Sequence, residues 1–284
     1  MKKETIGKIA LLSASFLWGF GFVAVQKSLD SGWSPFSLLA MRGLLGGLLF
    51  TVLSYRRKWW RNKSFLLSGV IAGIVMFISF VLQTYGQSYS TPSNAAFLTT
   101  LYVVFTPLLL RVLFKKKILP RVYLAVIVAI IGTFLLNYQG TLTFQFGDIL
   151  LILCAFAFAL HIILLEQMGR FDDALSLTAI QLLTMGVLSF IGMLLTKESF
   201  GSSGWIYVIY CAFISSGLAF FLQAFGQKNV NSSMASLILM LEAVFGVVGS
   251  VVFLSEQITW NMVVGGGLLL LSIVLVEMKI KTLD

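Results

Sequence analysis

Ionisable side chains inside the long apolar segments are the first candidates for chemistry in this 284-residue chain. Glu242, His161 and Arg42 are three such residues, and His161 is the single histidine. A carboxyl in this setting could bind a proton and a substrate in turn, a histidine could relay protons, and an arginine could pair with an anionic group. Each also has a structural interpretation. Glu242 and His161 could hydrogen-bond a neighbouring helix, and Arg42 could act in gating or reach a polar surface.

Glutamines recur in two pairs with helical spacing. Gln83 and Gln87 are four residues apart, and so are Gln223 and Gln227, which places each pair on one face of a helix. If Gln83 and Gln223 faced one cavity, they would offer donors and acceptors to a zwitterion or a heterocycle. Gln87 and Gln227 lie closer to the ends of their segments. Hydrogen bonds between helices would explain the same pattern, so both interpretations stay open.

Aromatic residues are a second kind of candidate lining. Trp18 stands out because it lies in the middle of an apolar segment beside Gly19 and Gly21. With 14% aromatic residues, most other rings must simply pack or meet lipid. The residues that we expect to bind a substrate are Trp18, Phe22, Gln83, Tyr85, Tyr102, His161, Gln223 and Glu242.

Signatures of an enzyme are missing from the sequence. We find no nucleophile with a plausible base, no phosphate-binding glycine loop, no metal-ligand cluster and no paired catalytic carboxylates. Cys154 and Cys211 lie within apolar segments and are interpreted as buried small residues. We therefore expect neither an enzyme nor a bound cofactor or metal.

The elements that carry these residues follow from the composition. Apolar residues make up 58% of the chain and charged residues only 11%, against about 25% charged in ordinary soluble domains. Ten spans of roughly 20 residues each would use most of the chain. This pattern predicts an all-α polytopic membrane protein. The expected helices are 8–26, 36–55, 65–88, 92–114, 121–137, 148–166, 175–196, 204–226, 232–254 and 260–278.

One boundary between helices is weak. The segment from Ser88 to Asn94 carries no charge, and only its turn-forming residues separate two helices from one long helix. Nine spans are therefore the alternative to ten. The first segment begins like a signal peptide, but its apolar run is long enough to span and is interpreted as a retained helix.

The basic residues predict the orientation in the membrane. With the N-terminus in the cytoplasm, 17 of the 20 Lys and Arg fall on the cytoplasmic side of ten spans. This predicts an inner or plasma membrane location with both termini cytoplasmic. The net charge of +9 then reflects topology and contact with the lipid bilayer, and we expect no nucleic-acid partner.

An internal repeat relates the two halves of the chain. Residues 80–87 align with 220–227 at an offset of 140, and between 80 and 118 twelve of 39 aligned residues are identical. Residues 37–40 align with 176–179 at an offset of 139. The expected repeats are 1–140 and 141–284, with five spans each. Because five is odd, the two repeats must have opposite orientations, which is an architecture of secondary transporters with a midplane substrate site.

Two motifs resemble a known family. Residues 18–22 (WGFGF), followed by Pro35 and Arg42, resemble the opening of drug/metabolite transporters of the EamA type. Residues 241–245 (LEAVF) and 254–259 (LSEQIT) are similar to that family's end-of-repeat pattern. A proline usually follows the glutamate where this chain has Ala243, and Lys116 stands where the second half has Glu256. The resemblance implies a ten-helix carrier that moves small metabolites, often outward.

Together these features predict a secondary-active transporter with a small-molecule substrate and alternating access between two inverted repeats. Export of an amino acid or a similar polar or amphiphilic compound is the leading expectation, and a passive channel or facilitator is the alternative. Proton coupling through Glu242 and a homodimer through Gly265–Gly267 are further expectations that the sequence leaves open.

Overall fold

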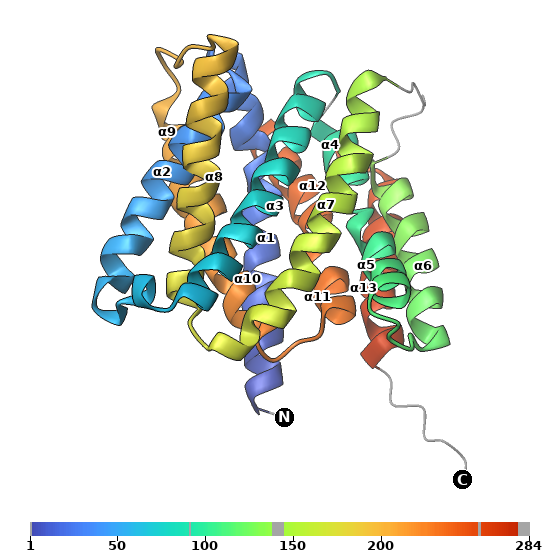
Figure 1. Ribbon diagram of the computed structural model, residues 1–284. Helices are drawn as coiled ribbons and strands as arrows, with labels where there is room; N and C mark the ends of the chain where they lie inside the picture. The colour runs from blue at the N-terminus through green and yellow to red at the C-terminus, as the bar shows by residue number, and fades with distance from the viewer. Residues whose placement is uncertain (1, 91, 138–144, 255–256, 278–284) are drawn as a thin grey trace.

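A computed structural model describes residues 2–90, 92–137, 145–254 and 257–277 (Figure 1). The elements before residue 145 are α1 (Lys2–Asp30), α2 (Pro35–Ser54), η1 (Tyr55–Arg57), η2 (Trp59–Arg61), α3 (Lys63–Ser88), α4 (Pro92–Thr99), α5 (Tyr102–Leu113) and α6 (Pro120–Asn137). Those after it are α7 (Phe146–Met168), η3 (Gly169–Phe171), α8 (Ala174–Thr196), α9 (Trp205–Ile209), the π-helix η4 (Tyr210–Leu218), α10 (Ala219–Gln227), α11 (Ser232–Leu239), α12 (Glu242–Leu254) and α13 (Trp260–Glu277). The predicted boundary between repeats, 140/141, falls outside the described residues.

The described chain is a bundle of apolar helices. Eight helical stretches of the described chain are long and apolar enough to cross a membrane, and three of them join consecutive elements: Ala95–Leu113, Trp205–Gln227 and Ser232–Gly249. Two shorter apolar helices are Pro120–Leu135 and Trp260–Val276. Large apolar side chains cover the outside, where Val52 and Leu195 are 73% and 78% exposed. Such a surface is favourable in lipid and unfavourable in water. The protein is therefore an all-helical, multi-pass membrane protein. The chain also turns between α3, which ends at Ser88, and α4, which begins at Pro92.

Three predicted helices are not continuous, which corrects the sequence-based boundaries. The fourth is interrupted after Thr99 and the ninth after Leu239. At both places the backbone forms a turn with hydrogen bonds between residues three apart in sequence. Val103 N–H donates to Thr100 O at 3.0 Å, and Ala243 N–H donates to Met240 O at 3.1 Å. The eighth contains the π-helix. Hydropathy does not reveal such changes because the residues remain apolar throughout.

Equivalent contacts recur in the two halves at the offset found in the sequence. The Gln87 side chain donates to Phe22 O at 3.1 Å, and Gln227, 140 residues later, donates to Ile162 O at 2.8 Å. Gly86 faces Gly147 backbone to backbone, and Gly226 faces Gly7 in the same way. Gly86 and Gly226 are equivalent positions at an offset of 140, and so are Gly7 and Gly147. The packing of α3 on α7 is therefore repeated by α10 on α1.

The first helix of each half packs among helices of the other half. α1 contacts α10, α11 and α12, whereas α7 contacts α3, α4 and α5. The pairs α2–α8 and α6–α13 join equivalent helices of the two halves. Figure 1 shows that α1 begins and α13 ends at the same end of the bundle. This exchange brings residues from both halves to the centre.

Glycines allow α2 and α8 to approach closely. A β-carbon added at Gly43 would lie 2.4 Å from Cα of Gly186, and one added at Gly47 would lie 2.8 Å from N of Leu183. Gly69 and Gly73 of α3 meet α8 in the same way. These contacts confirm that the two small-xxx-small pairs are sites of close helix packing.

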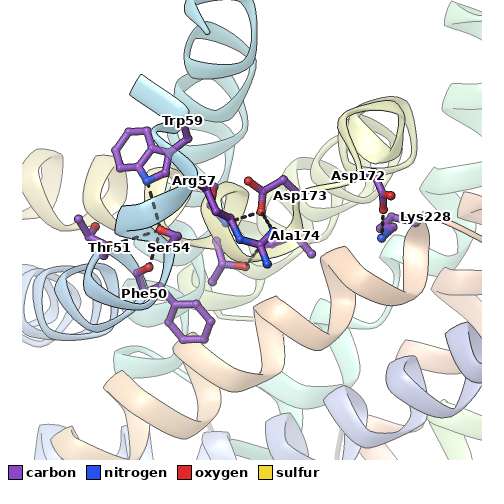
Figure 2. A network of polar contacts seen from close by, with 11 residues as sticks. Phe50, Thr51, Ser54, Arg57, Trp59, Asp172, Asp173, Ala174 and Lys228 are labelled. Carbon is purple, nitrogen blue, oxygen red and sulfur yellow. Dashed lines mark hydrogen bonds and ion pairs between the residues drawn. The ribbon is translucent and has the colours of Figure 1, made fainter. Parts of the chain in front are cut away.

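Polar contacts tie the helices together at the end of the bundle where α1 begins (Figure 2). Arg57 Nη1 lies 2.6 Å from Asp173 Oδ1, and the same carboxylate accepts from Ser176 N–H at the start of α8. Asp172 pairs with Lys228. The hydrogen bond from Lys228 lowers the pKa of Asp172 below its ordinary value. These pairs join the loop before α8 to the ends of α2 and α10.

Replacement of Gly43 by alanine tests the close packing. Gly43→Ala is expected to destabilise the protein by about 1–3 kcal/mol, the usual cost of overpacking, because the new methyl group meets backbone atoms of α8. Thermal unfolding in detergent measures the effect. Gly267→Ala is the matched control, since nothing lies within 4 Å of a β-carbon there. Equal melting temperatures for both variants would contradict the assigned contact.

Candidate central binding site

A cavity with about 520 Å³ of empty space lies in the centre of the described bundle. This volume counts space open to solvent as well as space enclosed by side chains. Its lining comes from both halves of the chain. The lining residues are Trp18, Gly21, Phe22, Val25, Arg42, Phe80, Gln83, Thr99, Tyr102, Phe158, Ile162, Ser215, Phe220, Gln223, Leu239 and Glu242.

Most of the lining consists of equivalent residues from the two repeats. Each pair is separated by 140 residues, the offset of the sequence repeat. The pairs are Trp18/Phe158, Phe22/Ile162, Phe80/Phe220, Gln83/Gln223, Thr99/Leu239 and Tyr102/Glu242. The cavity therefore lies on the approximate symmetry axis between the halves, where a transporter built from inverted repeats binds its substrate.

Tyr102 and Glu242 meet at the centre of this arrangement. Each is the first residue of the helix after an interruption, α5 and α12 respectively. The Tyr102 hydroxyl donates to Glu242 Oε1 at 3.1 Å, and the two side chains are 3% and 5% exposed as whole residues. A carboxyl at the N-terminal end of α12 also lies at the positive end of that helix dipole. The two interruptions therefore position one polar pair inside an apolar bundle.

Trp18 is held by the π-helix of the opposite half. Its indole N–H donates to Ser215 O at 2.8 Å, and Tyr210, at the start of the π-helix, donates to Leu17 O at 2.8 Å. The Trp18 ring also contacts Phe220, with ring centroids 4.8 Å apart. π-Helical turns inside α-helices occur often at functional sites. Here the π-helix fixes the orientation of a large ring at the cavity wall.

Arg42 is a buried cation in the same lining. The residue is 1% exposed, its Nε donates to Ser216 Oγ at 3.0 Å, and its guanidinium carbon lies 4.4 Å from the centroid of the Phe80 ring. Its Nη1 atom is buried and has no hydrogen-bond partner in the described part of the chain. Burial at this depth shows that Arg42 does not extend to the membrane surface.

The glutamine pairs divide into two kinds. Gln83 and Gln223 line the cavity, and Gln223 Oε1 is buried without a hydrogen-bond partner. Gln87 and Gln227 instead donate to backbone carbonyls of α1 and α7. The inner pair is thus available to a ligand, and the outer pair binds helices together.

Tyr85 and His161 lie outside the cavity lining, unlike the other predicted site residues. The Tyr85 hydroxyl donates to Glu198, and Glu198 Oε2 also accepts from Phe36 N–H at 2.9 Å. His161 Nε2 lies 2.6 Å from Gln181 Oε1 in a fully buried contact between α7 and α8. Their contacts are those of structural residues, so geometry gives no support to the substrate-binding role predicted for either.

Sequence reasoning missed several lining residues, among them Phe158, Ile162 and Ser215. The repeat contained a usable signal for the first two, because they are the equivalents of Trp18 and Phe22 at an offset of 140. Ser215 carried no such signal, since the π-helix exposes it to the cavity. Ser255 and Glu256, in the predicted end-of-repeat motif, fall outside the described residues.

Comparison with known proteins agrees with this geometry. The EamA-like transporter family model matches the chain twice, at residues 5–138 and 145–278. The chain belongs to the EamA-like transporter family. An uncharacterized transporter of Archaeoglobus fulgidus is 30% identical over 281 residues, which cover 98% of this chain and 88% of that protein. The uncharacterized transporter YoaV of Bacillus subtilis is 20% identical over 269 residues, covering 90% and 91%.

A solved crystal structure shows the same fold. It aligns with a TM-score of 0.79 and 18% sequence identity over 95% of this chain and 96% of that one. At this identity the likeness concerns the fold alone. Family membership and the apolar bundle together make this protein a multi-pass membrane transporter.

Access to the cavity can be measured with cysteine labelling. In a variant without Cys154 and Cys211, both buried, Gln83→Cys is expected to react with a small thiol reagent added in water. Ser189→Cys is the control, because Ser189 is fully buried and lies outside the cavity lining. Equal reactivity at both positions, or reaction at neither, would contradict a water-accessible central cavity.

Proposed function

We propose that the protein is a secondary-active carrier that exports small polar or amphiphilic metabolites, with amino acids as the leading class. The observation that carries the proposal is the central cavity, which equivalent residues of both repeats line. Two halves with equivalent packing can exchange the arrangements that close one end or the other at similar free energy. Alternating access follows if the cavity opens to each side in turn.

The moving bodies in this mechanism do not coincide with the two halves of the sequence. α1 packs among α10, α11 and α12, and α7 packs among α3, α4 and α5. A rocking motion that keeps these contacts therefore carries each first helix with the other repeat. The contacts between α2 and α8 are made through glycines, so this pair is a suitable place for the two bodies to pivot.

Different polar groups close the equivalent ends of α1 and α7. Near the end of α7, Glu166 accepts from Ser232 N–H at 2.8 Å and pairs with Lys116 Nζ at 2.9 Å. The equivalent residue near the end of α1 is Gln26, which lies 3.3 Å from Gln87 Nε2 and bonds to Asp30. The ion pair at one end and the amide hydrogen bonds at the other would give the two closed forms different stabilities.

The proposed location is the inner or plasma membrane, with both termini in the cytoplasm. The basic residues after α2, including Arg57, lie at the end of the bundle where α1 begins and α13 ends (Figure 1). A concentration of Lys and Arg at one end supports cytoplasmic placement of that end.

Glu242 is proposed as the residue that couples transport to protons. Its carboxyl is buried, accepts a hydrogen bond from Tyr102 and lies near Cys154 of α7, and Arg42 belongs to the same cavity lining. No Lys or Arg forms an ion pair with it within the described residues. An unpaired carboxyl in an apolar bundle can exchange a proton for a cationic group of the substrate.

Counterflow in proteoliposomes tests the carrier. Labelled amino acids, nucleobases and organic cations are presented outside, with the same unlabelled compound inside. A carrier gives saturable uptake that the internal compound accelerates. Fast, unsaturated uptake that ignores the internal compound would instead identify the passive channel and overturn alternating access.

Glu242→Gln tests the proton coupling. This variant is expected to lose accumulation driven by a pH gradient, because its side chain cannot bind and release a proton at accessible pH. Counterflow needs no net proton movement and is expected to persist. Glu198→Gln is the matched control, since Glu198 lies outside the cavity lining and bonds to Tyr85. Gradient-driven accumulation by Glu242→Gln would exclude Glu242 as the coupling residue.

A further inference from the structure

The lining of the cavity is not fully symmetric. Four lining residues, Gly21, Val25, Arg42 and Ser215, have equivalents that are not in the lining. Two of them are adjacent, since a β-carbon at Gly21 would lie 2.8 Å from Ser215 Oγ. Arg42 bonds to the next residue, Ser216. The residues Gly21, Arg42 and Ser215 therefore mark one region where the two halves differ, in addition to paired positions of different residue type such as Tyr102 and Glu242.

In the other repeat the equivalent positions hold two side chains that bond to each other. Ser34 and Asp173 both precede the equivalent helices α2 and α8 at an offset of 139, which pairs Arg42 with Gln181. Gln181 bonds to His161, and His161 occupies the position equivalent to Gly21. In one repeat, an imidazole nitrogen therefore bonds to an amide oxygen. In the other, Gly21 packs against Ser215 and Arg42 bonds to Ser216.

The surroundings of Arg42 do not neutralise its charge. Its side chain contacts the hydroxyl of Ser216 and the ring of Phe80, and no carboxylate forms an ion pair with it within the described residues. Nη1 remains a buried donor without an acceptor at the cavity. A buried charge is normally paired, so an anion that enters the cavity would remove an unfavourable arrangement.

We propose that Arg42 binds the carboxylate of a small zwitterionic substrate whose amino group faces Gln223 and Glu242. This inference rests on the proposed carrier function and names its substrate class. It also gives Arg42 a binding role in place of the gating or structural role expected from the sequence.

The charges and hydrogen-bond acceptors of the lining favour a substrate that carries one carboxylate and one amino group. Arg42 carries one positive charge, which a monoanionic carboxylate neutralises, whereas a phosphate dianion would leave a second negative charge beside Glu242. Gln223 Oε1 is a buried acceptor without a donor, and Glu242 has further acceptor capacity beyond Tyr102. Both acceptors suit an amino group. One cation and two acceptors in a single lining thus match both ends of an amino acid.

Competition in the unmodified protein gives the first test. Uptake of a mixture of labelled amino acids is measured by counterflow, with L-leucine, L-leucinamide or isoamylamine as the unlabelled competitor. Only L-leucine carries the carboxylate, so it alone is expected to compete. Equal competition by the amide would overturn the proposal, because a site for the carboxylate must distinguish these two compounds.

Variants at the site give the second test. Arg42→Gln is expected to raise the half-saturating amino-acid concentration about 10- to 100-fold, the effect of losing a charged hydrogen bond. Arg42→Lys retains the charge and is expected to lose less. Ser216→Ala keeps Arg42 but removes the partner of its Nε, and a smaller increase is expected. Arg111→Gln is the matched control, since Arg111 is exposed and outside the lining.

Thermal unfolding of each variant in detergent shows whether a loss of binding is only a loss of folding. Together with counterflow, stabilisation by L-leucine also distinguishes a failure of the zwitterion site from a failure of the carrier function. Counterflow of compounds without an acid group, unchanged in Arg42→Gln, would overturn the zwitterion site and leave the carrier intact. Stabilisation by L-leucine that depends on Arg42, without any counterflow, would support the site and overturn the carrier. Absence of both effects would overturn both.

Discussion

The arrangement of the centre depends on two helix interruptions in an apolar surrounding. Backbone N–H and C=O groups in lipid must find partners within the protein, so a helix can break only where protein or a cavity covers it. Here both breaks occur at the same position of the two repeats, before Tyr102 and Glu242, and the freed groups form tightened turns. The hydrogen bond between Tyr102 and Glu242 joins the breaks across the approximate axis.

Much of this architecture could be predicted from the sequence because its causes are periodic. Apolar runs indicate helices, and the repeat aligns residues that prove to make equivalent contacts, such as Gln87 and Gln227. Trp18, Gln83, Gln223 and Glu242 meet in one cavity because intramembrane polar groups avoid lipid. The division into two five-helix repeats and the count of ten spans stay predictions.

The remaining features have causes that a hydropathy pattern does not contain. A tightened turn or a π-helix changes the backbone while its residues stay apolar, so the interruptions and the role of Ser215 were invisible. Tyr85 lies outside the cavity lining because its partner, Glu198, comes from a loop far along the chain. His161 also lies outside the lining, where it contacts Gln181 of the neighbouring helix α8. Such pairings require knowledge of which helices are neighbours.

The proposed alternating-access mechanism and the proposed zwitterionic substrate place opposite demands on the cavity. Two closed forms of similar free energy need halves that pack alike, and the paired lining residues and glycine contacts meet that demand. A substrate with a carboxylate at one end and an amino group at the other needs different binding groups on the two sides of the cavity. Two identical halves cannot provide such a difference. Substitution at a few lining positions resolves the conflict, since Gly21 and Arg42 differ from His161 and Gln181 while the helices that carry them remain equivalent. A buried arginine without a carboxylate partner is costly in a membrane protein, and binding of a substrate anion is the physical reason that would retain it.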